Sequence, residues 1–294
     1  MSFPFEKTEV RATLTLPPKQ DGKIPAVLFV GASAPHIPSA PRETNDMFAD
    51  LARRLAATGI ASLRYEELPF DFSAVSDRDQ LPLDVQIVNP ALASIEYLSR
   101  VPEIDASAIF VAGHGLGGTL APYIAARQPH VRGVILMAAA AQPLEKSLAE
   151  QRKKDLQARG VASEEIEEQL AAQNRIFADM RSAKIPSGRI VEGATVAYWR
   201  DRMNRDAALK ARDLKLPVLV LQGSFDTQTT EDDYDRLQSL LRKKRGATAD
   251  FRWFPKLNHF FRTTEVAVGN KSEAQSGNLS QVVLETLARW IKSH

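Results

Sequence analysis

The sequence contains no cysteine among its 294 residues. This absence excludes disulfides, thiolate nucleophiles, cysteine-ligated zinc and iron–sulfur clusters. An excess of one charge is also lacking, because 38 Lys and Arg residues stand against 36 Asp and Glu residues and leave a net charge of +2. Both signs are spread along the chain, so no charge field points to nucleic acid or to an anionic membrane as a partner.

Long hydrophobic runs are absent as well. The longest apolar runs have the length of buried strands, far short of the ~20 residues that a membrane helix needs. The N-terminal segment MSFPFEKTEVRATLTL has no basic region followed by an apolar one, as a signal peptide would. We therefore expect a cytoplasmic, soluble protein. Its 44% hydrophobic and 25% charged residues are typical of a globular chain.

Short apolar runs typical of buried strands alternate with amphipathic stretches typical of helices. The expected strands are 9–16, 25–31, 60–65, 108–112, 131–139, 216–221 and 250–254, and the expected helices are 44–58, 85–100, 115–127, 232–242 and 279–292. We expect the first strand at a sheet edge and an interruption or a kink near Pro90 in the second helix. This alternation predicts an α/β fold with a doubly wound, mostly parallel sheet of about eight strands.

Residues 142–215 have a different texture, being highly charged and without a buried-strand run. One helix face there stays apolar through Ile166, Leu170, Phe177 and Met180. We expect residues 1–141 and 216–294 to form the core and residues 142–215 to form a helical cap or lid. Two interpretations of this insertion remain open: a solvated decoration packed on the core, or a lid that shapes a pocket.

The segment Ile109–Leu120, IFVAGHGLGGTL, leads from a strand through a glycine-rich turn into a helix. Gly113, Gly115 and Gly118 fit the G-x-G-x-x-G pattern that holds a dinucleotide pyrophosphate. Gly113 and Gly117 equally fit the outer positions of G-x-S-x-G, in which a nucleophilic serine occupies the turn, with Gly115 in place of that serine. This segment alone does not separate a dinucleotide-binding oxidoreductase from a hydrolase.

Other parts of the chain favour the hydrolase. A dinucleotide-binding fold needs an acid about 20 residues further on to bind the ribose, and the first acid there is Glu145, which comes too late. A hydrolase needs an acid after a later strand and a histidine after the last strand, in the order nucleophile, acid, histidine. Asp226 in LVLQGSFD and His259 in WFPKLNHFF stand in those places.

These segments resemble the α/β-hydrolase fold family, and more closely its dienelactone-hydrolase-like and acyl-esterase branch. The resemblance covers nearly the whole chain and rests on PAVLFVGAS, DLARRLAATGIASLRY, AGHGLGGTLAP, LPVLVLQGSFD and LNHFF in that order. It implies hydrolysis of a carboxylic ester or a related acyl compound, with a helical cap. The chain departs from the family pattern twice: residue 115 is Gly instead of Ser, and residues 30–33 read VGAS where relatives often have His-Gly.

In the hydrolase interpretation, Gly115 occupies the nucleophile position. His259 is the general base and acid, and Asp226 orients its imidazole and stabilises the imidazolium. His114, next to the nucleophile position, is expected to pack beneath the turn.

Backbone N–H groups of Leu116 and Ala32 are expected to form the oxyanion hole, with Ser33 as a competing donor that also lies beside the substrate. If the insertion is a lid, its aromatic residues bind substrate in the same pocket: Phe177, Tyr198 and Trp199. These residues favour an acyl or aromatic ester of moderate size over a long lipid.

Gly115 leaves three interpretations open. The chain is an otherwise intact hydrolase whose serine has been changed and which still binds substrate, a natural binding protein that lost hydrolysis, or a lyase or cyclase that needs only a base and an oxyanion hole. We favour the first, because the other motif residues all remain: Gly113, Gly117, Asp226 and His259.

No metal or other cofactor is expected, because His36, His130 and His294 lack partners at metal-ligand spacing. The expected partner is a small-molecule acyl or ester substrate. Neither nucleic acid nor a membrane is expected to bind, and a homodimer is one option for the assembly.

Overall fold

The computed structural model describes residues 1–5, 8–18, 22–31, 40–66, 82–264 and 278–294. Within these ranges an eight-stranded sheet has the order β1 (Ser2–Phe5), β2 (Thr8–Thr15), β4 (Ala61–Tyr65), β3 (Ile24–Val30), β5 (Ile104–His114), β6 (Val131–Met137), β9 (Val218–Gly223) and β10 (Ala249–Phe254). In this order, all neighbouring strands from β4 to β10 pair in parallel, whereas β1 pairs antiparallel with β2, and β2 pairs antiparallel with β4. The mostly parallel α/β fold predicted from the sequence is confirmed.

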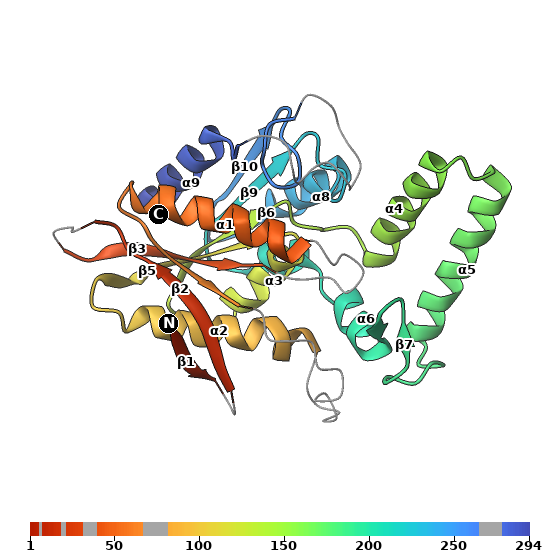
Figure 1. Ribbon diagram of the computed structural model, residues 1–294, viewed down its shortest axis with the longest axis horizontal. Coiled ribbons are helices and arrows are strands. Elements are labelled where there is room, and N and C mark those ends of the chain that lie inside the picture. Colours follow the sequence, from red (N-terminus) through yellow and green to blue (C-terminus); the bar gives the residue numbers. More distant parts are fainter. Residues whose placement is uncertain (6–7, 19–21, 32–39, 67–81, 265–277) are drawn as a thin grey trace.

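Helices cover both faces of this sheet (Figure 1). One face packs against α1 (Ala40–Ala56) and α9 (Gln281–Ser293). The other packs against α2 (Asn89–Ser99), α3 (Leu116–Ala125) and α8 (Glu231–Leu241). Because both faces are covered, strand β3 reads IPAVLFV and is buried at nearly every position. The loops that follow the parallel strands meet at one edge of this core, where ligands bind in such sheets.

Two details differ from the sequence prediction. Strand 9–16 was expected at a sheet edge, but β1 pairs with β2, with Ser2 opposite Arg11, and covers that edge. A four-residue strand is too short for periodicity to reveal. The helix expected at 85–100 begins instead as a short π-helix, η1 (Asp84–Val88), and continues as α2. Pro90 lies in the first turn of α2, where a missing N–H group costs no helical hydrogen bond.

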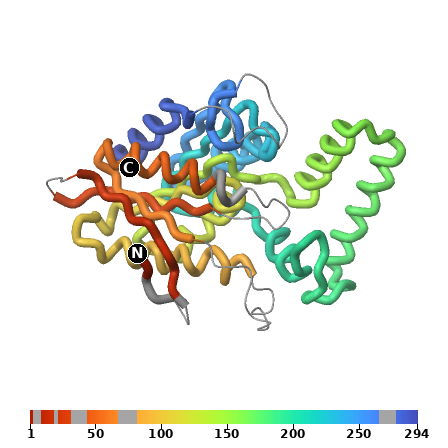
Figure 2. The backbone as a smooth tube through the Cα atoms, in the orientation of Figure 1, coloured from red at the N-terminus to blue at the C-terminus, as the bar shows by residue number. Residues whose placement is uncertain are grey.

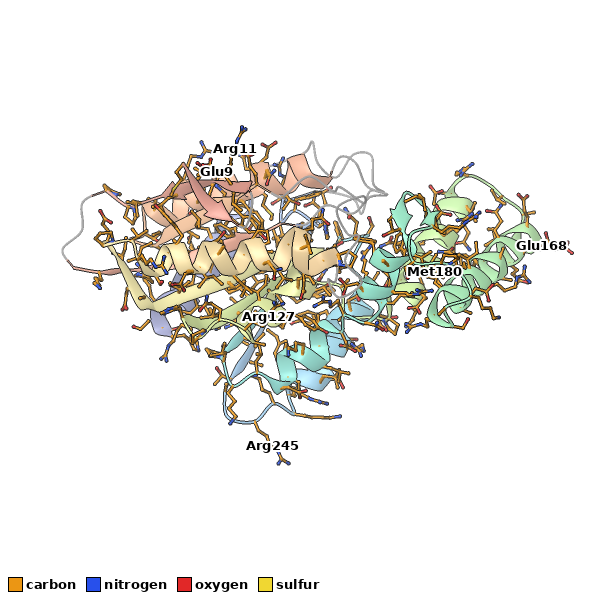
Figure 3. All side chains as sticks on the ribbon, turned by 90° about the horizontal axis from the view of Figure 1, so that it is seen from below. Glu9, Arg11, Arg127, Glu168, Met180 and Arg245 are labelled. Carbon is orange, nitrogen blue, oxygen red and sulfur yellow. The ribbon has the colours of Figure 1, made fainter. Side chains whose placement is uncertain are left out.

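Residues 142–215, called the arm below, lie between β6 and β9. They contain α4 (Leu144–Ala158), α5 (Ser163–Arg181), the short strands β7 (Ile190–Val191) and β8 (Ala194–Thr195), α6 (Val196–Met203) and α7 (Ala207–Asp213). Helices α4 and α5 form a hairpin that extends away from the sheet (Figure 1), on the side opposite to both chain ends (Figure 2). Glu168 lies at its outer end and Met180 nearer the core (Figure 3). None of the described helices combines the length and the apolarity needed to cross a membrane.

Both ends of the arm are held by α8. The carboxylate of Asp233, 2% exposed, accepts the backbone N–H groups of Ala141 and Gln142, each at 2.7 Å. At the other end, Arg236 forms an ion pair with Asp206 at 2.6 Å. A single core helix therefore positions the beginning and the last part of the arm relative to the sheet.

Candidate active site

Gly115 occupies the turn between β5 and α3 with φ +56° and ψ −120°. Residues with a side chain rarely adopt this backbone conformation. A Cβ atom added to Gly115 would lie 3.6 Å from Nε2 and 3.9 Å from Cε1 of His259. A side chain at this position would therefore point at the imidazole.

The neighbouring glycines are required by close packing. A Cβ atom on Gly113 would lie 2.1 Å from the carbonyl oxygen of Gly117, and one on Gly117 would lie 2.0 Å from that of Val30. On Gly118 it would lie 2.7 Å from Cβ of Ala139. These distances are shorter than atoms can approach, so the turn packs against β3 and the end of β6 only because the side chains are absent. The glycine pattern thus has a structural reason that involves no bound phosphate.

Asp226 follows β9 and His259 follows β10, and the two side chains meet. Oδ2 of Asp226 lies 2.8 Å from Nδ1 of His259, and the side chains are 0% and 7% exposed. The two loops are joined by a hydrogen bond from the N–H of Phe225 to the carbonyl of Leu257. Gly223 permits this approach, because a Cβ atom there would lie 2.3 Å from the same carbonyl oxygen.

The carboxylate of Asp226 accepts hydrogen bonds on both oxygens. Oδ1 accepts the N–H groups of Gln228 and Thr229 at 2.8 and 2.9 Å, and Oδ2 accepts the hydroxyl of Thr229 and the amide of Gln222. Burial raises the pKa of Asp226, but the charge of His259 and the hydrogen bonds from His259 and Thr229 outweigh burial and hold the pKa below its usual value. An ionised carboxylate fixes the proton of His259 on Nδ1 and leaves Nε2 as the basic nitrogen.

His114 lies beneath the turn and supports His259 from below. Its ring is 3% exposed, with its centroid 4.4 Å from that of His259. Burial, and next the charge of His259, lower the pKa of His114 to about 3, so the ring is neutral. Its Nε2 lies 2.9 Å from the carbonyl oxygen of His259 and therefore donates, while Nδ1 accepts from the hydroxyl of Thr44 at 3.3 Å. This placement agrees with the expectation from the sequence.

A pocket opens beside Gly115 and His259. From the core it is lined by residues that include Leu116, Thr119 and Phe260; from the arm it is lined by Leu144, Ser147, Leu148 and Gln151 on α4, and by Arg202 and Arg205 in and after α6. Among the described residues that line it, none is Asp or Glu. The pocket thus lies between the Gly115 turn with His259 on one side and the inner ends of α4 and α6 on the other.

The two residues expected in the oxyanion hole have different outcomes. Leu116 is the first residue of α3 and lines the pocket. The first N–H groups of a helix have no intrahelical acceptor, so its N–H is suited to receive a negative oxygen. Ala32 and Ser33 lie outside the described residues.

The three aromatic residues expected to bind substrate do not line this pocket. Tyr198 and Trp199 are 0% and 2% exposed, and the Trp199 ring packs edge-on against Tyr198 at 5.4 Å and against Phe177 at 6.0 Å. These side chains form the apolar interior of the arm, because α5 and α6 need a shared core to pack together. The structure therefore places Phe177, Tyr198 and Trp199 outside the pocket beside Gly115, whereas Phe177 and Trp199 line a separate pocket on the arm. Their role in binding substrate, and the substrate size expected from it, stay predictions.

Several residues of the site were not found from the sequence. Gln222 and Thr229 hold the carboxylate of Asp226, and Ser147 and Arg202 line the pocket from the arm. Their only sequence signal is a polar residue near a strand end or on a charged helix, which is too common to distinguish them. In the described part of the chain, no group of three or more His, Asp or Glu side chains is arranged to hold a metal ion.

Comparison with known proteins gives consistent matches. The family model described as serine aminopeptidase, S33, matches residues 42–262. Esterase EstD of Thermotoga maritima is 32% identical over 276 residues, which are 93% of this chain and 63% of EstD. The chain thus spans less than two thirds of the length of this relative.

Two solved structures share the fold. Est1E from Butyrivibrio proteoclasticus, with bound ferulic acid, has a TM-score of 0.63 at 15% identity, covering 100% of this chain and 98% of its own. Proline iminopeptidase of Mycobacterium smegmatis has a TM-score of 0.62 at 16% identity, with the same coverage of 100% and 98%. At such identities these likenesses show the fold alone.

Proposed function

Because this chain belongs to the serine aminopeptidase, S33, family of α/β hydrolases, we propose that it has the framework of a carboxylic ester hydrolase in which Gly115 replaces the nucleophilic serine. The similarity to EstD favours an ester over an amide as the substrate. The observation that carries the proposal is the alignment of residue 115, His259 and Asp226. A Cβ atom on residue 115 would lie 3.6 Å from Nε2 of His259, and Nδ1 of the same ring lies 2.8 Å from Oδ2 of Asp226.

A serine at residue 115 would complete this line. Its Oγ would attack the ester carbonyl while Nε2 of His259 takes the hydroxyl proton, and the imidazolium would then return that proton to the leaving alcohol. The ionised Asp226 stabilises the imidazolium and keeps Nδ1 protonated. Water would hydrolyse the acyl-enzyme by the same proton transfers in reverse order.

The oxyanion formed in each step needs backbone donors. We assign one donor to the N–H of Leu116, at the N-terminus of α3, and the second to the loop after β3, with Ala32 favoured and Ser33 as the alternative. The inner ends of α4 and α6 line the pocket, and this supports the role of residues 142–215 as a cap over a core made of residues 1–141 and 216–294.

In the chain as it stands, Gly115 offers no atom to form an acyl-enzyme. We expect it to bind an ester and turn it over slowly at most, through a water molecule that His259 activates. Removing one member of a serine–histidine–acid triad leaves roughly 10³- to 10⁴-fold catalysis over water, which comes from the oxyanion hole and from binding. Weak activity of this kind is compatible with the proposal.

The test is to replace Gly115 by serine and to assay para-nitrophenyl esters of increasing acyl length. Hydrolysis by Gly115→Ser that depends on His259 supports the proposal. Absence of hydrolysis by a folded Gly115→Ser protein contradicts it.

A second candidate is a small-molecule binding protein or a histidine-base lyase or cyclase. The observation in its favour is that the Asp226–His259 pair is intact although residue 115 has no side chain. A receptor would hold its ligand unchanged even with serine at residue 115, so the same variant separates the two candidates.

A further inference from the structure

The pocket beside Gly115 carries two arginines of different status. Arg205 is fully engaged, since it pairs with Asp201 and Asp84 at 2.8 Å each and its side chain is 7% exposed. Its positive charge is therefore balanced by carboxylates that belong to the fold. Asp201 also accepts the N–H of Leu83 at 2.9 Å, which ties α6 to the core.

Arg202, three residues earlier and within α6, has no such balance. It forms no ion pair with any described residue, and its Nη1 is buried without a hydrogen-bond acceptor among them. Its guanidinium carbon lies 5.9 Å from the centre of the Trp199 ring, a contact that supports the guanidinium and uses none of its in-plane N–H donors. A buried donor without an acceptor costs free energy, and proteins rarely leave one so.

Ser147 on α4 is the second such donor at this pocket. Its hydroxyl oxygen is buried and has no hydrogen-bond partner in the described ranges, and it lines the pocket together with Arg202, Gly115 and His259. A guanidinium and a hydroxyl that both lack acceptors, in a pocket whose described lining has no carboxylate, match an anionic ligand group that accepts hydrogen bonds.

We propose that Arg202 and Ser147 form a carboxylate-binding subsite, and that the preferred esters carry a free carboxylate at the end remote from the ester bond. A single unbalanced cation fits a singly charged carboxylate, which can take an N–H from Arg202 and the hydroxyl hydrogen of Ser147. The inference deepens the proposed function and rests on it for the position of the ester carbonyl, which lies beside Gly115 and His259. The substrate class is thus the monoesters of dicarboxylic acids and their analogues.

The first experiment measures binding to the unaltered chain by calorimetry. The two ligands are monomethyl adipate and its neutral analogue with a primary amide in place of the carboxylate. We expect the anion to bind roughly 10- to 100-fold more tightly, the range for a hydrogen bond to a charged group. Equal affinity for the two ligands, or binding of neither, overturns the subsite.

Variants assign this preference to residues. Arg202→Gln and Ser147→Ala should weaken binding of the anion far more than binding of the amide, so that the ratio of the two affinities falls toward one. Arg202→Lys should keep part of the preference, because it retains the charge but loses the planar N–H geometry. Arg159→Gln is the matched control: Arg159 is 66% exposed on the arm, pairs with Asp155 and does not line the pocket. An equal effect of Arg202→Gln and Arg159→Gln would mean that the preference for the anion comes from the overall charge of the protein, and it would refute the subsite.

The second experiment separates this inference from the function on which it rests. The Gly115→Ser protein is assayed with the mono-para-nitrophenyl ester of adipic acid and with the corresponding amide. A higher kcat/KM for the anionic ester that disappears in Arg202→Gln supports both proposals. Hydrolysis of both esters at equal kcat/KM leaves the ester hydrolase standing and refutes the subsite. Selective binding of the anion without any hydrolysis keeps the subsite and refutes the hydrolase.

Discussion

Nε2 of His259 lies 3.6 Å from the point at which residue 115 would carry its Cβ atom. That distance is shorter than a Cβ–Oγ bond plus a hydrogen bond of about 2.8 Å, so the Oγ of a serine whose Cβ–Oγ bond is turned off the direct line can reach hydrogen-bond distance of the imidazole without movement of the backbone. Restoring the serine should therefore restore the chemistry. We expect Gly115→Ser to raise kcat for para-nitrophenyl butyrate by about 10³-fold or more, and His259→Ala in the same chain to abolish the gain.

Gly115→Ala is the matched control for this gain. Alanine and serine both have to adopt the positive φ of the turn, at a cost of about 1–3 kcal/mol in the free energy of unfolding, but only serine brings a hydroxyl. Both variants should lose similar stability in urea, and only the serine variant should react with a fluorophosphonate probe. A folded Gly115→Ser protein that neither reacts with the probe nor hydrolyses a broad ester panel would falsify the proposed hydrolase.

The buried carboxylate should matter as much as the base. In the Gly115→Ser background, Asp226→Asn replaces the acceptor for Nδ1 of His259 by a neutral amide, so the imidazole loses both its fixed tautomer and the charge that stabilises its protonated form. We expect kcat to fall by about 10⁴-fold with a small change in KM. A loss of less than tenfold in kcat would show that Asp226 has only a structural role.

The low pKa of His114 predicts a loss of stability in acid. Below pH 6.5 the unfolded chain binds a proton on this imidazole, whereas the folded chain does not until its pKa of about 3 is reached. The free energy of unfolding should therefore fall with decreasing pH across this window, by about 1.4 kcal/mol per pH unit well below pH 6.5. Phenylalanine at this position keeps the ring and cannot titrate.

Urea unfolding of the parent chain and of His114→Phe at pH 7 and pH 5 checks this contribution. The absolute stabilities will differ, because the variant loses two hydrogen bonds, so the quantity to compare is the change between the two pH values. The parent should lose about 2 kcal/mol more than the variant. Parallel pH dependence of the two proteins would contradict a buried, neutral His114.

The turn glycines make a prediction about folding. A Cβ atom on Gly117 would lie 2.0 Å from the carbonyl oxygen of Val30, a backbone atom of the central strand β3 that has no room to move. We expect Gly117→Ala to lower the free energy of unfolding by about 3 kcal/mol or more, at the upper end of overpacking costs. Gly188→Ala is the control, because a Cβ atom there meets nothing within 4 Å. Equal urea midpoints of the two variants would rule out the close approach.

The fold was predictable because buried parallel strands leave a strong trace in sequence. Runs such as AVLFV and LPVLVL are apolar throughout because helices cover both sheet faces. The positions of Asp226 and His259 were predictable as well, because each residue follows a strand that the sequence pattern reveals. Strand β1 was not predictable, because a short edge segment needs no apolar run.

The substrate side of the site was harder to predict. Part of the pocket lining comes from helices of the arm, and which face of a charged helix points inward depends on packing that no local pattern records. Trp199 was expected to contact the ligand and lies in the apolar interior of the arm, whereas Arg202, three residues later, lines the pocket although no sequence pattern singled it out. Aromatic residues in an insertion therefore say less about its ligand than polar side chains that the fold leaves without partners.

The attachment of the arm to α8 separates two tasks along the chain. Asp233 and Arg236 hold its two ends, the side chains of the proposed carboxylate subsite lie between those ends, and the acid–histidine pair lies outside them. One contiguous piece can thus be exchanged at two fixed joints, so that a different molecule is admitted while proton transfer is left untouched. Helix α8 thus provides two fixed attachment points, between which an arm with other side chains can be inserted.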